Sequence, residues 1–302
     1  MNNTQALRTR IYVDGYNLYY GCLKGSRYKW LDLWQVFDHV LRSIFLEESG
    51  SPVKFELQPL AIKYFTAPIL RNFARAEDSV SSQVQYHRAL ANHRKATIEI
   101  IEGYYDAKPA RAHVFIKGKP AVACEKMEIW KLEEKESDVS LALHAYSDAV
   151  RDEVDHVVIV TNDTDIVPAM RMIRLHSTAT IGLIVPAREQ LRRVNADLKR
   201  LAHWTRDHIL ESELDAAQLP NTVRLGNQTV HKPASWYSRP DLLLPILSEA
   251  RRVKKSEGAA WKWLNQPCAH LDDRVPIDMV GNDDDAAVLR TYMDRYARDF
   301  GV

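Results

Sequence analysis

One stretch near the middle of the chain constrains the fold most: residues 157–170, VVIVTNDTDIVPAM. Its first four residues are apolar and β-branched, which is typical of a strand buried on both faces of a parallel sheet. The strand must end where the polar run Thr161–Asp165 begins, and a helical pattern resumes at Ile166. Open α/β sheets bind ligands in the crevice at the carboxyl ends of their strands. We therefore expect Asp163 and Asp165 at a ligand site.

Helix capping offers a simpler explanation of the same turn, because an aspartate or threonine here can accept from the free N–H groups of the next helix. One cap needs one side chain, whereas this turn offers several. Two carboxylates this close also repel one another unless a cation or a proton relieves them. We therefore expect Asp163 and Asp165 to do more than cap.

Strand and helix patterns alternate from residue 10 to about residue 205. The expected strands are 10–14, 60–65, 97–101, 157–160 and 180–185, and the expected helices include 31–46, 79–95 and one that opens near 136. This alternation predicts an α/β fold: a mainly parallel, Rossmann-like sheet with helices on both faces, in three layers. The G-x-G-x-x-G and G-x-x-x-x-G-K-[ST] loops do not occur in the sequence, which argues against dinucleotide and P-loop chemistry.

Two more polar groups fall at comparable places in this pattern. Asp14 ends the first expected strand, and Asn17 follows three residues later. Asn17 could steady a carboxylate, a water or a phosphate, or make an ordinary turn hydrogen bond. Asp138 lies in the first turn of a helix, where its charge suits the helix dipole without any further role, although its spacing from Ala142 and Ala145 directs it toward the buried face.

Composition excludes several classes of protein. Lys+Arg number 41 against 40 Asp+Glu, so attraction to a nucleic acid must come from local patches. The three cysteines, Cys22, Cys124 and Cys268, have neither metal-site nor disulfide spacing. The amino terminus has no signal-peptide core, and no apolar run nears the ~18 residues of a membrane helix. We expect a soluble cytoplasmic protein without a membrane partner.

Two basic segments are candidates for RNA contact. Residues 103–119 interleave positive and aromatic side chains, which suits single-stranded nucleic acid, although a solvated hairpin would read the same way. Residues 188–206 are locally basic and form either a phosphate-contacting rim or an ordinary wet helix face. The candidate RNA-binding residues are Lys108, Arg111, Lys117, Lys119, Arg188, Arg192 and Arg193.

Three motifs in register resemble the NYN family of PIN-like, metal-dependent ribonucleases: DGYN at 14–17, EKESDVSLA at 134–142 and NDTD at 162–165. The resemblance spans about residues 8 to 210 and implies RNA cleavage that leaves a 5′-phosphate. Clustered carboxylates without His or Cys ligands suit Mg²⁺ or Mn²⁺. The expected metal ligands are Asp14, Asp138, Asp163 and Asp165, with Asn17 completing the catalytic set and Thr161 hydrogen-bonding around them.

The chain departs from the family pattern at two positions. Many relatives have Gly where this chain has Glu136, and an Asp where it has His144, although one branch of the family also carries His there. Glu136 adds an acid beside the expected site. We interpret His144 as a packed or surface histidine rather than a ligand. Neither change removes one of the four aspartates.

The tail, about residues 243 to 302, resembles the toxin-binding domain of Xre/ParS-type antitoxins. The resemblance rests on Trp263-Leu264 before Pro267, on Pro276-Ile277 and on a terminal helix. It implies a small helical module that binds a protein partner or forms a homodimer, and the alternative is a generic helical appendage. The expected domains are 1–217 for the nuclease, 218–240 for a linker rich in Pro, Asn, Gly and Ser, and 241–302 for the helical module.

The function we expect is metal-dependent endoribonuclease activity on single-stranded or structured RNA. The alternative is a catalytically weak regulator that binds RNA or protein through the antitoxin-like tail, and an antitoxin proper is a third reading. Four mutually repelling acids favour the enzyme, since they serve little purpose without a cation. DNA stays open as a substrate because the sequence contains no evident device that reads the 2′-hydroxyl.

Overall fold

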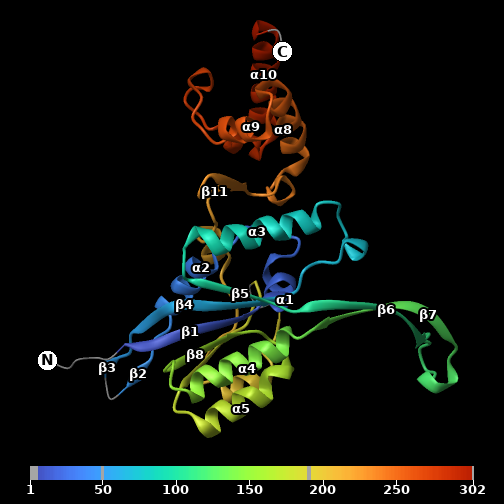
Figure 1. The fold of residues 1–302 in the computed structure, drawn as a ribbon, viewed down its shortest axis with the longest axis vertical. Coiled ribbons are helices and arrows are strands. Elements are labelled where there is room, and N and C mark those ends of the chain that lie inside the picture. Colours follow the sequence, from blue (N-terminus) through green and yellow to red (C-terminus); the bar gives the residue numbers. More distant parts are fainter. Residues whose placement is uncertain (1–5, 49–50, 189–191, 301–302) are drawn as a thin grey trace.

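A six-stranded parallel sheet forms the centre of the protein, with strand order β10-β9-β8-β1-β4-β5. The structure, a computed structural model, describes residues 6–48, 51–188 and 192–300. Helices cover both faces of the sheet (Figure 1). The predicted three-layer α/β class, with a PIN-like, Rossmann-like sheet and a helical tail, is therefore confirmed.

The elements follow the predicted order. The strands of the sheet are β1 (Leu7–Asp14), β4 (Phe55–Thr66), β5 (Ile98–Glu102), β8 (His156–Val160), β9 (Thr180–Ile184) and β10 (Trp204–Arg206). The helices around it are α1 (Gly15–Leu18), α2 (Leu33–Arg42), α3 (Ser79–His93), α4 (Ser137–Val150), α5 (Val167–His176), α6 (Ala196–Leu201) and α7 (Glu211–Ala216). A small hairpin, β2 (Glu47–Glu48) with β3 (Ser51–Pro52), precedes β4.

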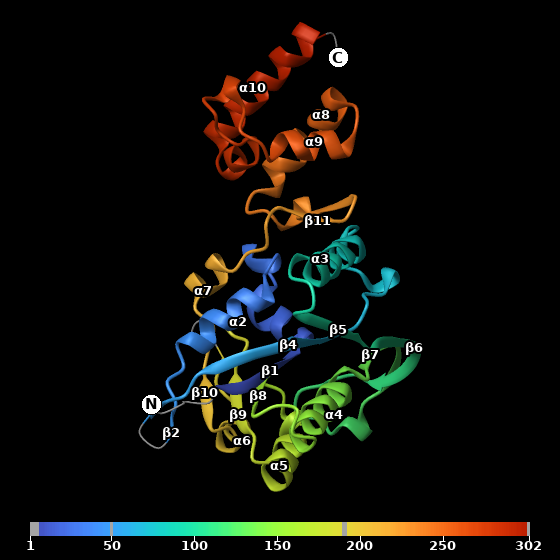
Figure 2. The same ribbon diagram turned by 60° about the vertical axis from the view of Figure 1, so that its left-hand side comes forward.

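Alternation along the central strands divides the core into two parts. Ile11 and Val13 of β1 pack with α2 and α3 on one face, and Tyr12 packs with α4 and α5 on the other. The two helical layers lie on opposite sides of the sheet in Figure 2. Because β8 is buried along its whole length, its apolar run needs no polar face, as its sequence predicted.

Strand β4 is longer than its sequence pattern predicted, because it begins at Phe55 rather than near Leu60. Leu60 has φ +52°, and the pairing of β4 with β1 shifts register at this point. A bulge therefore interrupts the strand where the apolar pattern breaks, so that the sequence predicted only the half beyond it.

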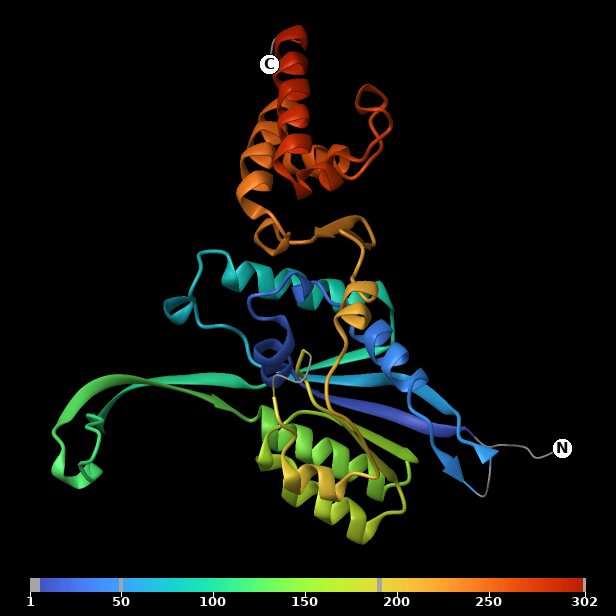
Figure 3. The same ribbon diagram turned by 180° about the vertical axis from the view of Figure 1, so that it is seen from behind.

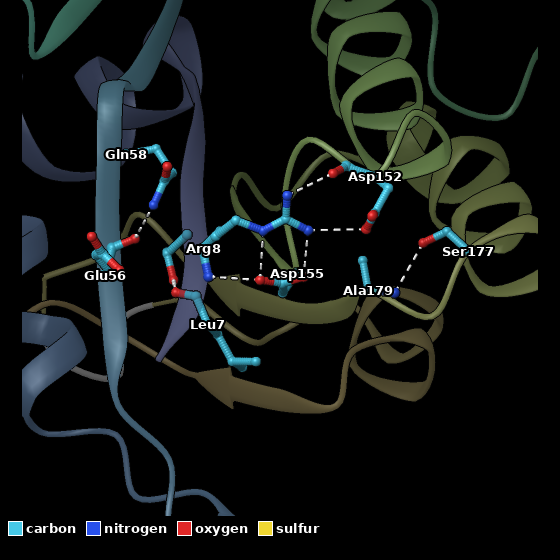
Figure 4. Close-up of polar contacts among 9 residues, drawn as sticks. Leu7, Arg8, Glu56, Gln58, Asp152, Asp155, Ser177 and Ala179 are labelled. Atoms are coloured by element: carbon cyan, nitrogen blue, oxygen red, sulfur yellow. Dashed lines mark hydrogen bonds and ion pairs between the residues drawn. The ribbon is translucent and has the colours of Figure 1, made fainter. Parts of the chain in front are cut away.

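Arg8 fixes the amino ends of the central strands. Its Nη2 lies 2.7 Å from Oδ1 of Asp155, its Nε donates to Oδ2 of the same carboxylate at 2.9 Å, and its Nη1 donates to the carbonyl of Asp152 at 2.7 Å (Figure 4). The hydrogen bond from Arg8 lowers the pKa of Asp155. Because the guanidinium contacts both oxygens of the Asp155 carboxylate, the two side chains are held in one relative orientation. This contact helps to fix the register between β1 and β8.

Two segments extend beyond the sheet. Strands β6 (Tyr104–His113) and β7 (Lys126–Lys135) form a long antiparallel hairpin that projects away from the body (Figures 1 and 3). Residues 218–240, predicted as a linker, contain a second hairpin, β11 (Thr222–Leu225) with β12 (Gln228–His231). Val223 and Val230 of this second hairpin are buried in the core on the α2/α3 face.

The tail has its own core. Helices α8 (Pro240–Lys254), α9 (Glu257–Leu264) and α10 (Asp283–Phe300) enclose a separate cluster of buried apolar residues that includes Leu243, Trp261 and Leu289. Trp261 is 4% exposed and anchors this core. Within the described residues, the longest helices are too short or too polar to cross a bilayer.

Candidate active site

The order of the strands brings the predicted polar motifs together. Strand β1 pairs with β4 on one side and β8 on the other, and Val13 lies opposite Val160. Asp14 and Thr161, the residues that follow, therefore lie side by side at the carboxyl edge of the sheet. The chain changes direction across the sheet between these two strands, and this is where open α/β sheets bind their ligands.

Asp14 is held in one orientation by three hydrogen bonds. Its carboxylate accepts from the backbone N–H of Asn17 at 2.9 Å, from Nδ2 of Asn17 at 2.6 Å and from Oγ1 of Thr161 at 2.8 Å. The side chain is 6% exposed, and burial raises its pKa despite these donors. Asn17 and Thr161 thus take the supporting positions that the sequence predicted.

The NDTD turn both caps a helix and faces the site. The backbone N–H of Asp163 donates to Oγ1 of Thr161 at 3.1 Å, and the N–H of Asp165 donates to Oδ1 of Asp163 at 3.0 Å. Asp163 is half-buried and Asp165 is exposed. The capping interpretation is therefore correct for Oδ1 of Asp163. The second oxygen of Asp163 and the carboxylate of Asp165 are not used by this cap and could contact a ligand.

Asp138 joins these acids from α4. Burial, together with the charges of Asp14, Glu134, Asp163 and Asp165, raises its pKa to about 6. Asp138 is therefore within electrostatic reach of the other three predicted aspartates. A carboxyl that resists ionisation beside other carboxylates is a common feature of sites built for a cation or for proton transfer.

Glu134 is an acid that the sequence analysis did not assign. It lies at the end of β7, and its Oε1 accepts from the backbone N–H of Ser137 at 3.2 Å and from the Ser137 hydroxyl. The EKESD motif contained Glu134, and its charge contributes to the raised pKa of Asp138, so it lies near the predicted aspartates. We call the carboxyl edge of the sheet that carries these acids the acidic edge.

The acids of this site do not form a complete metal-coordination shell in the described part of the chain. Among the residues that the structure describes, no three His, Cys, Asp or Glu side chains are grouped closely enough to hold a metal ion. Their chemistry still fits Mg²⁺ or Mn²⁺, since the donors are hard oxygens and a cation would relieve their repulsion. Asp138, which helical spacing had directed toward the buried face, is exposed, and so is Asp165. Their role as ligands stays a prediction.

The structure explains the two departures from the family pattern. Glu136 has φ +77°, in the left-handed region that favours glycine, which accounts for the Gly of many relatives. His144 contacts Lys63, with 3.1 Å between Nδ1 and Nζ, and packs edge-on against Phe65. Lys63 in turn pairs with the buried Asp148 at 2.9 Å. His144 therefore belongs to a structural cluster beneath α4, as interpreted from the sequence.

The candidate RNA-binding residues separate into two groups. Arg192 reaches the site, with Nη1 3.4 Å from Oδ1 of Asn17, and the carbonyl of Arg193 accepts from Nδ2 of Asn162 at 3.0 Å. Arg188 lies 3.7 Å from Glu211. The remaining candidates, Lys108, Arg111, Lys117 and Lys119, lie along the projecting β6–β7 hairpin and its tip, where Lys108 pairs with Asp106 at 2.9 Å.

A parallel sheet with carboxylates at the point where its strand order reverses is the arrangement of PIN-like proteins. The model of the NYN domain family matches residues 8–202, and the chain belongs to this family. The model of the antitoxin Xre/MbcA/ParS C-terminal toxin-binding domain matches residues 250–298. Both resemblances predicted from the sequence are thereby confirmed.

Two individual proteins are also similar to this chain. The curated protein 6-hydroxy-3-succinoylpyridine 3-monooxygenase HspA of Pseudomonas putida is 46% identical over 297 residues, covering 96% of this chain and 95% of that protein. A solved structure of a protein of unknown function from Vibrio parahaemolyticus is 19% identical, covers 69% of this chain and 96% of that chain, and has a TM-score of 0.40.

Replacing Glu136 with Gly should stabilise the protein by about 0.5–1 kcal/mol, because glycine adopts the left-handed conformation without a side-chain clash. The matched control is Ser140→Gly in the interior of α4, which should destabilise by about 0.5–1 kcal/mol. Urea unfolding measures both changes. A loss of stability in the Glu136 variant would contradict this account of the turn.

Proposed function

We propose that the acidic edge is a divalent-metal-dependent active site that hydrolyses RNA phosphodiester bonds. The observation that carries the proposal is the electrostatic coupling of Asp138 to Asp14, Asp163 and Asp165 near the strand-order reversal, where burial and these charges raise the pKa of Asp138 to about 6. Membership of the NYN family, a group of ribonuclease-like folds, supports the same reading. Four acids held together against their repulsion call for a positive partner.

Asp14, Asp138 and Asp163 would hold the metal, and Asp165 would bind a second ion or position the attacking water. Bound Mg²⁺ or Mn²⁺ supplies an activated water and neutralises charge on the phosphate. Asn17 and Thr161 keep the Asp14 carboxylate in one orientation through their hydrogen bonds. That rigidity leaves less entropy to lose when the substrate binds.

Basic groups offset the repulsion between an acidic site and an anionic substrate. Arg192 is exposed and already lies against Asn17, so its guanidinium is placed to meet a phosphate that approaches Asp14. The exposed lysines and arginine of the β6–β7 hairpin would contact RNA further from the scissile bond. Phosphate contacts of this kind position a nucleic acid without reading its sequence.

Asp163→Asn should reduce Mg²⁺- or Mn²⁺-dependent cleavage of labelled RNA at least about 100-fold, because it removes a ligand charge while keeping the side chain's shape. The matched control is Asp197→Asn on α6, where the carboxylate pairs with Arg200 at the surface. EDTA should abolish wild-type cleavage. Full activity in the Asp163 variant, or in EDTA, would refute the metal-dependent mechanism.

A second candidate function rests on the full-length relative. The P. putida protein is named as a monooxygenase of 6-hydroxy-3-succinoylpyridine, and 46% identity across both chains favours a related substrate here. Such a reaction consumes dioxygen and two reducing equivalents, so its assay must supply a reductant such as NADH. Loss of the pyridine in that assay, with RNA intact under Mn²⁺, would favour this function over hydrolysis.

We further propose that the tail binds another protein, either a toxin-like partner or a second copy of this chain. The antitoxin-type domain supports a protein-interaction role. Leu244 on α8 and Val288 on α10 are 51% and 46% exposed, so apolar surface is available for contact. The alternative function is that of a regulator: the nuclease domain would be inactive, and the protein would act through the contacts of its tail.

The full chain should therefore be a dimer by light scattering after gel filtration, or should bind its partner tightly. The variant Leu244→Asp with Val288→Asp should abolish that association and leave RNA cleavage unchanged. Leu210→Asp, at an equally exposed position outside the tail, is the matched control. Association that survives the tail substitutions would contradict the assignment.

A further inference from the structure

A cavity of about 680 Å³ opens directly beside the acidic edge. Its walls come from α1 and the turn after it, the loop between β4 and α3, helix α3 and the base of the β6–β7 hairpin. Gly15, Glu134 and Ser137 line it, and these residues adjoin Asp14 and Asp138, so the cavity and the acidic edge are continuous. Its volume falls within the range of about 300–1,000 Å³ that is typical of small-ligand sites.

Aromatic rings make up much of the cavity wall. Tyr16 and Tyr20 lie with ring centroids 4.5 Å apart, and they are 49% and 42% exposed. The other rings that line the cavity are Tyr19, Tyr64, Phe73, Tyr86, Tyr105 and Trp236. Packing alone accounts for Tyr86, which is buried and donates to the carbonyl of Leu31 at 2.8 Å. It does not account for two open tyrosines at the entrance.

The charges around the cavity are unevenly matched. Within the described part of the chain, neither Lys29 nor Arg75 has a carboxylate within ion-pair distance. The lining acid Asp78, by contrast, accepts from the hydroxyls of Ser82 and Ser235. Glu134, the other acid that lines the cavity, accepts from the hydroxyl of Ser137. The cavity therefore offers two cations without a carboxylate partner, whereas its acids already accept hydrogen bonds from serines.

Arg75 lines the cavity together with Tyr16, Tyr19 and Tyr20. Burial and the neighbouring Tyr20 raise the pKa of Tyr16 to about 12, and the charge of Arg75 opposes that shift. The same charge opposes the rise in the pKa of Tyr19. Arg75 is exposed, and its guanidinium matches phosphate or carboxylate geometry with two donors at once.

We propose that this cavity binds a planar aromatic ring that carries an anionic group, with the ring against Tyr16 and Tyr20 and the anion on Arg75. A nucleobase with its phosphate and a pyridine with a carboxylate share this chemistry. The inference deepens the proposed function and rests on it for one point: the reacting end of the ligand faces Asp14 and Asp138. Lys29, whose Nζ lies 5.9 Å from the centre of the Trp236 ring, is the second cation that lines the cavity.

Calorimetric titration of the full chain in EDTA tests the cavity without any catalysis. The probes are uridine 5′-monophosphate, 6-hydroxypyridine-3-carboxylate and the uncharged uridine. We expect at least one anionic probe to bind, and uridine to bind more weakly than its phosphate. Arg75→Gln should weaken that binding about tenfold or more, since it removes a charge-assisted contact. Tyr16→Leu should weaken it by a similar factor through lost stacking.

Arg171→Gln on the exposed side of α5 is the matched control and should bind like the wild type. Circular dichroism and Tm confirm that each variant is folded. Binding of the nucleotide alone identifies RNA as the source of the ligand, and binding of the pyridine alone identifies a small aromatic acid. Binding by neither probe, or unchanged binding in both cavity variants, would overturn the inference. Intact binding with no RNA cleavage under Mn²⁺ would contradict the hydrolase proposal alone.

Discussion

The placement of Asp14 against Thr161 is the contact on which the rest of the site depends. It exists because β1 and β8 run parallel with Val13 opposite Val160, and because Arg8 fixes the other ends of both strands. A shift of one residue would turn the buried carboxylate to the wrong face of the sheet. The hydrogen bonds to Asp14 thus report the alignment of the whole sheet.

Much of this could be predicted from the sequence, since the informative residues follow regular patterns. The buried run before Thr161 and the strand-ending Asp14 indicated one edge of a parallel sheet. Helical spacing directed Asp138 toward the buried face, whereas the structure leaves it exposed. Other features had no such signal. No pattern in the sequence singled out Glu134, whose carboxylate accepts from Ser137 beside Asp138, and the left-handed backbone of Glu136 cannot be read from its side chain.

The cavity could not be predicted from the sequence. Tyr16, Tyr19 and Tyr20 flank Asn17 at helical spacing, which was a usable hint. Arg75 and Trp236 carry no pattern that ties them to the same place, because one lies in an irregular loop and the other in a segment whose composition predicted only a linker. Long-range packing brings them together, and no local periodicity encodes it.

One fold accommodates two chemistries in the proteins this chain resembles. The NYN domain supports a nuclease, and the P. putida relative is named as a monooxygenase. Fold alone does not choose between them, because function resides in the groups at the site. The acidic edge favours binding of a cation, and the neighbouring cavity favours binding of an aromatic anion. Both features suit an RNA nucleotide, and the cavity alone suits a substituted pyridine.

Anomalous diffraction from crystals soaked in Mn²⁺ tests the central claim most directly. We expect a strong peak at the carboxyl edge of the sheet, within about 2.0–2.6 Å of oxygens from Asp14 or Asp163 and from Asp138. A peak elsewhere on the molecule, or none at this edge with the crystals saturated in Mn²⁺, would show that the acids serve another purpose and would contradict the proposal.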